Sequence, residues 1–202
     1  MPETVKLPVM EQFYTLQGEG YYAGQAAWFI RLGGCDVGCV WCDVKESWDA
    51  DVHPHITVEE LVKRASATPA EIVVITGGEP AMYDLSLLCN ELRSAGKRVH
   101  IETSGAHPLL GVFDWVCFSP KKFKAPLSEV AALADELKVI VFNKSDFDWA
   151  RTWEEEVPET CLLYIQPEWD KREVVEPMMI EFIKENPRWR MSIQTHKYLG
   201  ID

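Results

Sequence analysis

The sequence has little positive charge for its length. Its 202 residues include 20 lysines and arginines against 32 aspartates and glutamates, which gives a net charge of −12 with histidine neutral. Proteins that bind nucleic acids or anionic membranes through charge need basic surfaces, so this balance argues against both kinds of partner. It does not exclude a small anionic substrate, because a buried site can be locally basic inside an acidic protein.

Long apolar runs, internal repeats and low-complexity stretches are absent as well. No run approaches the length of a membrane span, and residues 1–6 lack the charged and apolar regions of a signal peptide. The composition, 47% hydrophobic and 26% charged, is typical of a globular protein. We therefore expect a cytoplasmic protein that binds neither membrane nor nucleic acid and forms a single domain over residues 1–202.

Strand-like and helix-like segments alternate along the chain. Short apolar runs predict strands at residues 28–32, 71–76, 99–102, 115–118, 137–142, 161–165 and 190–194. Other segments predict helices at residues 57–65, 84–96, 127–134, 146–155 and 173–185. This alternation is typical of βαβ units and a parallel sheet. A closed eight-unit barrel takes about 250 residues, so we expect an α/β fold with a partial (β/α) barrel of about six parallel strands. A doubly wound open sheet is the alternative.

Polar and glycine-rich segments follow six of these predicted strands. They are residues 31–42, 76–80, 102–105, 119–121, 166–167 and 194–197. In parallel α/β folds ligands bind at the carboxyl ends of the strands, which share one edge. The six segments therefore predict one site at that edge.

The six cysteines divide into two groups. Three stand alone in apolar stretches, where we expect small, inert core residues: Cys89, Cys117 and Cys161. The others fall within eight residues, in the spacing Cys-x3-Cys-x2-Cys: Cys35, Cys39 and Cys42. Three thiolates on a four-iron cluster leave one iron open to an exchangeable molecule. Zinc is the second interpretation, because structural zinc sites usually have four ligands and the nearest other candidates are His53 and His55.

The cysteine spacing, with Trp41 directly before the last cysteine, resembles that of the radical S-adenosylmethionine (SAM) enzymes. Thr76-Gly77-Gly78-Glu79-Pro80 resembles the segment that contacts the methionine end of SAM in that family. The resemblance implies a [4Fe-4S] cluster and SAM as cofactors, with hydrogen abstraction by a 5′-deoxyadenosyl radical. No side chain is therefore assigned as a catalytic residue.

Segments at both ends of the chain resemble one family of radical SAM enzymes, the 7-carboxy-7-deazaguanine synthases. They are residues 13–20, 29–35, 41–43 and 191–199. The resemblance implies ring contraction of 6-carboxy-5,6,7,8-tetrahydropterin to 7-carboxy-7-deazaguanine with loss of ammonia, in queuosine or deazapurine biosynthesis. It also implies a homodimer and an electron donor such as flavodoxin or ferredoxin.

The same resemblance assigns site residues. The cluster ligands are Cys35, Cys39 and Cys42. The SAM contacts are Trp41, Cys42, Asp43, Gly78, Glu102, Ser119, Pro120 and Lys121. The substrate contacts are Leu16, Gln17, Gly18, Glu19, Arg31, Thr76 and His196. Chemistry supports two assignments independently: Gln17 and Glu19 suit the amide-like edge of a pterin, and Arg31 suits a carboxylate that needs a bidentate cation.

One position departs from the family pattern. The residue after Cys-Asp is usually a threonine or serine whose hydroxyl helps to bind magnesium, but here it is Val44. We therefore expect weak or absent magnesium dependence. Two rival functions stay open. A glycyl-radical activase would share the cluster but has no need of residues 17–19 and 194–197, and a regulatory protein would use the cysteines for zinc or cluster sensing.

Overall fold

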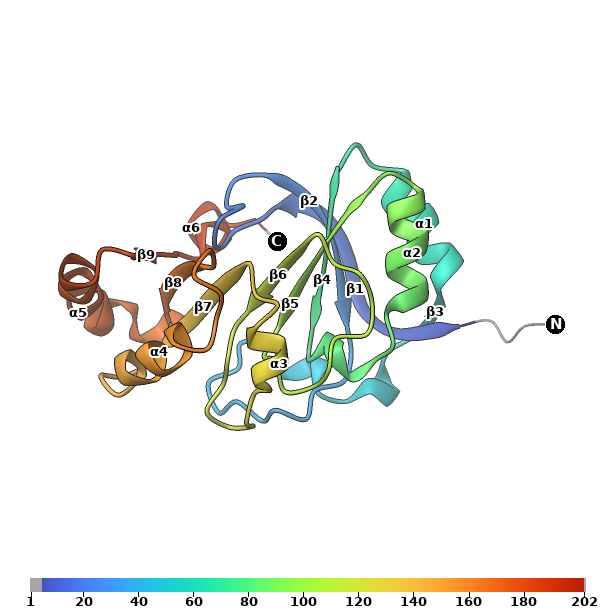
Figure 1. Cartoon of the computed structure of the whole chain (residues 1–202). Coiled ribbons are helices and arrows are strands. Elements are labelled where there is room, and N and C mark those ends of the chain that lie inside the picture. The colour runs from blue at the N-terminus through green and yellow to red at the C-terminus, as the bar shows by residue number, and fades with distance from the viewer. Residues whose placement is uncertain (1–4, 202) are drawn as a thin grey trace.

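The computed structural model describes residues 5–201, which contain one nine-stranded sheet (Figure 1). Residues 1–4, on which part of the signal-peptide expectation rests, lie outside this range. The strands are β1 Lys6–Leu16, β2 Ala26–Leu32, β3 His55–Thr57, β4 Ile72–Gly77, β5 Arg98–Thr103, β6 Trp115–Phe118, β7 Glu136–Val141, β8 Leu162–Pro167 and β9 Trp189–Met191. Their order in the sheet is β3-β1-β2-β4-β5-β6-β7-β8-β9.

Seven adjacent strands, β2 and β4 to β9, are parallel to one another, whereas β1 runs antiparallel to both β2 and β3. From β2 onward the strands follow one another in space as they do in the chain, apart from β3 at the far edge. A doubly wound sheet would reverse its order at a switch point, so that alternative is wrong. The expected α/β fold with an open, partial barrel is confirmed, with seven parallel strands where about six were predicted.

The α-helices are α1 Val58–Ser66, α2 Ser86–Ser94, α3 Ser128–Ala131, α4 Asp146–Glu154, α5 Arg172–Glu185 and α6 Thr195–Leu199. Short 3₁₀ turns cover Lys45–Ser47, Ala50–Val52, Pro80–Met82 and Trp169–Lys171. Figure 1 shows α1 and α2 together near β3, and α4 and α5 near the opposite end of the sheet. None of the helices within residues 5–201 combines the length and the apolar character needed to cross a membrane.

Local sequence explains where several elements begin and end. The Thr57 hydroxyl accepts a hydrogen bond from the backbone N–H of Glu60 at 3.2 Å, as the predicted cap of α1 requires. Gly96 takes a left-handed φ of 78° after α2 and ends it. The helix predicted at 127–134 is too long. Only α3 is α-helical there, because the N–H groups of Leu133 and Ala134 donate to the carbonyl three residues earlier, as in a 3₁₀ turn, and not four residues earlier.

The two faces of the sheet differ in polarity. On β2, β4 and β5 the outward residues are apolar and pack against α1 and α2, and on β7 and β8 they pack against α3, α4 and α5. Helices thus cover one face. The three isolated cysteines are buried, as predicted. The alternate residues of the same strands face the other way. Those near the amino ends of β2 and β4 form a small apolar cluster, Ala27, Phe29, Ile72 and Val74, and those near the carboxyl ends line a cavity.

Candidate active site

A cavity of about 460 Å³ lies at the carboxyl ends of the parallel strands. Its wall is built by alternate, mostly polar residues on five strands: Arg31, Thr76, Glu102, Lys138 and Gln166. The residue before each of them on its strand packs into the helix-covered core: Ile30, Ile75, Ile101, Leu137 and Ile165. The volume falls in the range typical of small-molecule sites, and the place agrees with the prediction made from the strand-following segments.

The cavity brings together nearly all of the residues assigned from the sequence. Those that line it are Leu16, Gln17, Gly18, Glu19, Arg31, Cys35, Cys39, Trp41, Cys42, Asp43, Thr76, Gly78, Glu102, Ser119, Lys121 and His196. Pro120 is not among the lining residues. It is buried behind the wall, where its carbonyl accepts a hydrogen bond from Trp149 Nε1 at 3.2 Å.

The cysteine loop, residues 33–54, crosses one side of the cavity. Its backbone is folded back on itself, with the Gly34 N–H donating to the Ser47 carbonyl at 2.6 Å and the Cys35 N–H donating to the Trp48 carbonyl at 3.1 Å. These bonds fix the backbone at the first cysteine.

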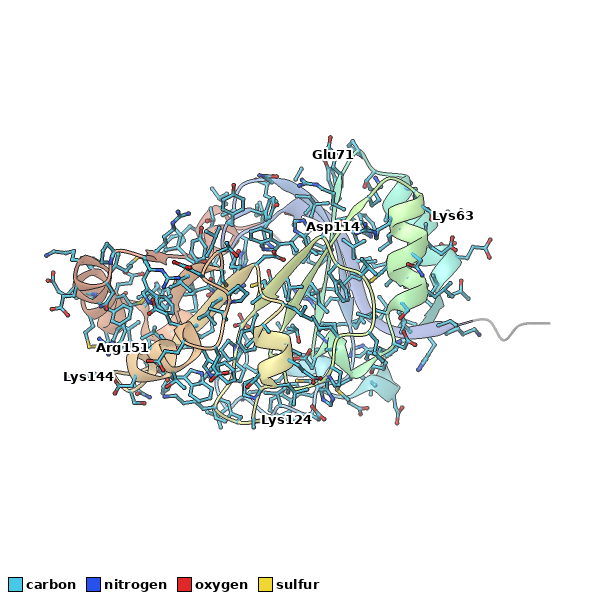
Figure 2. All side chains as sticks on the ribbon, in the orientation of Figure 1. Lys63, Glu71, Asp114, Lys124, Lys144 and Arg151 are labelled. Atoms are coloured by element: carbon cyan, nitrogen blue, oxygen red, sulfur yellow. The ribbon has the colours of Figure 1, made fainter. Side chains whose placement is uncertain are left out.

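Charged side chains attach the cysteine loop to its neighbours. Asp36 accepts from His107 Nε2 at 3.0 Å and forms an ion pair with Lys124, which Figure 2 labels at the lower edge of the molecule. Asp43 forms an ion pair with Lys197 Nζ at 2.7 Å. The loop is thus joined to the segments after β5 and β6 and to the C-terminal helix α6.

The donor set fits an iron–sulfur cluster with one open iron. Cys35, Cys39 and Cys42 pack in one group with Val37 and Ala106, and the three isolated cysteines do not line the cavity. Within residues 5–201, no group of three or more His, Cys, Asp or Glu side chains is placed to hold a single metal ion. Cysteines that each bind a different iron need not meet at one point. Burial raises the pKa of Cys39 to about 11, so a metal that binds it must displace a proton.

Next to the cysteines lies a lysine ammonium beside an aromatic ring. Lys121 Nζ donates to the carbonyl and hydroxyl of Ser119 at 2.7 and 2.5 Å and lies 5.9 Å from the centre of the Trp41 ring. Burial lowers the pKa of Lys121. The ammonium is therefore held by Ser119 beside the aromatic face, on the cysteine side of the cavity.

Glu79 has a structural role that its sequence motif did not show. Its buried carboxylate accepts hydrogen bonds from Thr103 Oγ1 at 2.5 Å, Ser104 N–H at 2.8 Å and Ala81 N–H at 3.0 Å, and one from the Ser104 hydroxyl. With these bonds it joins the loops that follow β4 and β5. Because its hydrogen-bond donors all belong to these two loops or to the end of β5, the carboxylate holds the loops together and so stabilises the wall of the cavity.

Elsewhere on the wall of the cavity, a buried lysine joins two carboxylates. Lys138 Nζ lies 2.6 Å from Glu19 Oε2 and 2.7 Å from Glu102 Oε2. Gln194 Nε2 donates to Glu19 Oε1 at 3.0 Å, and Gln17 Nε2 donates to Glu102 Oε1 at 3.2 Å. The resemblance assigns Glu102 to SAM, but in the structure its carboxylate pairs with Lys138 and belongs to the same cluster as Glu19.

Segments near the two ends of the chain meet beside this cluster. The Thr195 N–H donates to the Gly18 carbonyl at 2.9 Å, and the Gly20 N–H donates to Ser192 Oγ at 2.9 Å. A Cβ atom added at Gly18 would stand 2.1 Å from His196 Nδ1, so the imidazole lies directly against this glycine. Burial lowers the pKa of His196. The N-terminal and C-terminal motifs thus form one surface, although about 175 residues separate them.

Arg31 lies on the same wall and already has one anionic neighbour. Its Nε atom donates to Glu11 Oε1 at 2.6 Å, and its guanidinium lies 5.8 Å from the centre of the Phe13 ring. Among residues 5–201 this ion pair uses Nε alone. A carboxylate in the cavity could therefore be met by the terminal nitrogens.

Lys138 is the main site residue that sequence reasoning missed. It stands in the strand predicted at 137–142, among apolar residues. A lysine inside a buried strand needs a compensating anion, and this was the signal that could have identified it.

Comparisons with known proteins agree with the geometry. The family model described as the radical SAM superfamily matches residues 29–124. The 7-carboxy-7-deazaguanine synthase of Flavobacterium psychrophilum is 51% identical over 195 residues, which cover 96% of this chain and 92% of the relative. That of a Synechocystis species is 50% identical over 198 residues, covering 98% and 95%. The crystal structure of QueE from Escherichia coli superposes with a TM-score of 0.84 at 33% identity and covers 95% of each chain. The chain therefore belongs to the 7-carboxy-7-deazaguanine synthase family, within the radical SAM superfamily.

Proposed function

We propose that the chain is a 7-carboxy-7-deazaguanine synthase. It would convert 6-carboxy-5,6,7,8-tetrahydropterin to 7-carboxy-7-deazaguanine by ring contraction with loss of ammonia, in queuosine or deazapurine biosynthesis. The observation that carries the proposal is one cavity whose lining combines three cysteines with Gln17, Glu19 and Arg31. Family membership over nearly the whole chain supports the choice of reaction.

The protein's own contribution is binding, orientation and exclusion of water. When bound, the [4Fe-4S] cluster and SAM would supply the radical chemistry. Cys35, Cys39 and Cys42 would hold the cluster, and the side of the cavity with Trp41 and Lys121 would face SAM.

The substrate side offers complementary groups for a flat, polar heterocycle with a carboxylate. Arg31 would pair with the carboxylate through its terminal nitrogens. Glu19 and Gln17 would meet the N–H and carbonyl groups of the pterin edge. The walls of the cavity would keep these groups largely away from solvent, which strengthens each polar contact.

The proposal is tested by anaerobic incubation of the reconstituted protein with the carboxytetrahydropterin, SAM and a reductant. We expect 7-carboxy-7-deazaguanine, identified by mass spectrometry, with SAM regenerated. Cleavage of SAM without consumption of the pterin would contradict this reaction and favour an activase. Stoichiometric zinc without SAM cleavage would contradict the radical enzyme as well.

Magnesium dependence should be weak, because Val44 lines the cavity with an apolar side chain in place of the usual hydroxyl. We expect chelation of divalent cations to change the turnover of the unchanged chain by less than about twofold, since a lost metal ligand removes most of the affinity. A Val44→Thr variant, which restores the hydroxyl, should gain dependence on added magnesium. Turnover of the unchanged chain that collapses on chelation and returns only with magnesium would contradict the prediction.

Partners and location form the rest of the proposal. A one-electron carrier such as flavodoxin or ferredoxin would reduce the cluster, and two copies of the chain would form a homodimer. The dimer is supported by exposed apolar side chains in the C-terminal segment, where Tyr198 and Leu199 are 56% and 58% exposed. A cytoplasmic location is supported by the six unpaired cysteines, which suit a reducing compartment.

A further inference from the structure

Lys138 is an unusual residue on the wall of the cavity, because its side chain is only 4% exposed and it still carries an ammonium group. Its two anionic partners come from distant segments, with Glu19 in the loop after β1 and Glu102 on β5. The second oxygen of each carboxylate is held by an amide, from Gln194 and Gln17 respectively. All five side chains line the cavity.

We propose that Lys138 is a positioning residue for the substrate, acting through Glu19 and Glu102. It keeps both carboxylates ionised and fixed in direction, so that both can accept hydrogen bonds from N–H groups of a heterocyclic substrate. The substrate named in the test rests on the proposed function; the role of Lys138 rests on the geometry of these three side chains.

Electrostatics explains why the lysine is needed. Glu19 and Glu102 are half-buried carboxylates that approach the same nitrogen. Such a pair of like charges disfavours the ionised form of both, and a cation between them offsets this. A carboxylate is an acceptor only, whereas its protonated form presents a hydroxyl donor. Loss of Lys138 would therefore turn one acceptor into a donor, which faces a substrate N–H with the wrong group.

The pKa shifts of Glu19 and Lys138 agree with this role. Burial acts to raise the pKa of Glu19, but the charge and hydrogen bond of Lys138, with the hydrogen bond from Gln194, lower it to about 2. Burial acts to lower the pKa of Lys138, but its anionic neighbours hold it well above the usual range. Those neighbours are Cys117 when ionised, Glu102, Glu19 and Glu136, and the other groups that face this cluster are His196 and Lys121.

A purely structural role explains the arrangement less well. Buried ion pairs are weak sources of stability, because desolvation of the charges offsets much of their attraction. An apolar residue at position 138 would continue the apolar run of β7 without this cost. The chain instead keeps a charged triad where the cavity wall is formed.

The test compares Lys138→Met in the unchanged chain and in a chain that already carries Glu19→Gln and Glu102→Gln. Equilibrium binding of the carboxytetrahydropterin is measured by calorimetry between pH 5 and 9, together with kcat and KM. In the unchanged background we expect binding at pH 7 to weaken by at least about tenfold, the size of one charge-assisted hydrogen bond. Affinity should fall further as the pH falls, because a carboxylate then takes up a proton. In the Gln/Gln background Lys138→Met should have little effect, since there is no carboxylate left to position.

Lys138→Gln is the second variant, and it keeps the test valid if the Lys138→Met variant does not fold. It keeps a hydrogen-bond donor but not the charge, and it should show the same new acidic limb in binding, with folding checked by thermal unfolding. If the Lys138 variants bind the carboxytetrahydropterin with the affinity and pH dependence of the unchanged chain, the inference is wrong and the proposed function is unaffected. An equal loss of affinity in both backgrounds would have the same meaning. An unchanged chain that binds no carboxytetrahydropterin would overturn the proposed function and this inference with it.

Discussion

Cys39→Ala is expected to abolish both SAM cleavage and product formation. The cysteine loop supplies three thiols to the cavity, and the isolated cysteines do not line it, so none of them is placed to replace a lost ligand. The reaction depends on the cofactors for an acceleration that in enzymes is typically about 10⁶-fold or more, so activity should become undetectable. The effect is measured after anaerobic reconstitution, by iron analysis, by absorbance at about 400 nm and by product assay.

Cys89→Ala is the matched control for this experiment. Cys89 is fully buried in α2, on the helix-covered side of the sheet and away from the cavity. Its loss should cost about 1 kcal/mol of stability, as small core truncations do, and leave iron content and turnover unchanged. A Cys39→Ala chain that keeps its cluster absorbance and forms product would show that this cysteine is not a ligand.

Sequence periodicity was sufficient for the elements that the core holds in place. The predicted strand 115–118 agrees with β6, and the predicted helices 146–155 and 173–185 agree with α4 and α5 to within a residue at each end. These segments have an apolar side that packs in the core. It was not sufficient for α6, which follows a short edge strand, has no buried residue and is held by contacts with the loop near Gly18.

The site residues also divide into those that the sequence could predict and those that it could not. The cysteine and glycine motifs could be predicted because each is contiguous, and its chemistry can be read from neighbouring residues. The partners of Glu19 could not be predicted, because Lys138 and Gln194 stand 119 and 175 residues further along the chain. Only the fold shows that one carboxylate meets both, and the sequence carries only the anomaly of a lysine within an apolar strand.

The second large effect is expected at Gly78, where two loops of the site meet. A Cβ atom at this position would stand 2.2 Å from the Gly34 carbonyl oxygen and 2.8 Å from Cys35 Cβ. That same carbonyl accepts a hydrogen bond from the Glu79 N–H at 2.8 Å. A backbone oxygen in the cysteine loop has no rotamer with which to move aside, so a methyl group must separate the loops.

Gly78→Ala should therefore lower the free energy of unfolding by about 1–3 kcal/mol, as overpacking does. It should also reduce turnover by about 100-fold, because displacement of reacting groups by about 1 Å has an effect of that size. Gly96→Ala is the control that separates the loss of stability from the loss of turnover. Gly96 has a left-handed φ of 78° with open space around it, so alanine there should cost about 1–2 kcal/mol of backbone strain. It should leave cluster content and kcat unchanged. Thermal unfolding, iron content and kcat are measured for both chains. Equal losses of kcat in the two variants would mean that stability alone limits activity, whereas a loss confined to Gly78→Ala places the cause at the contact between the glycine turn and the first cysteine.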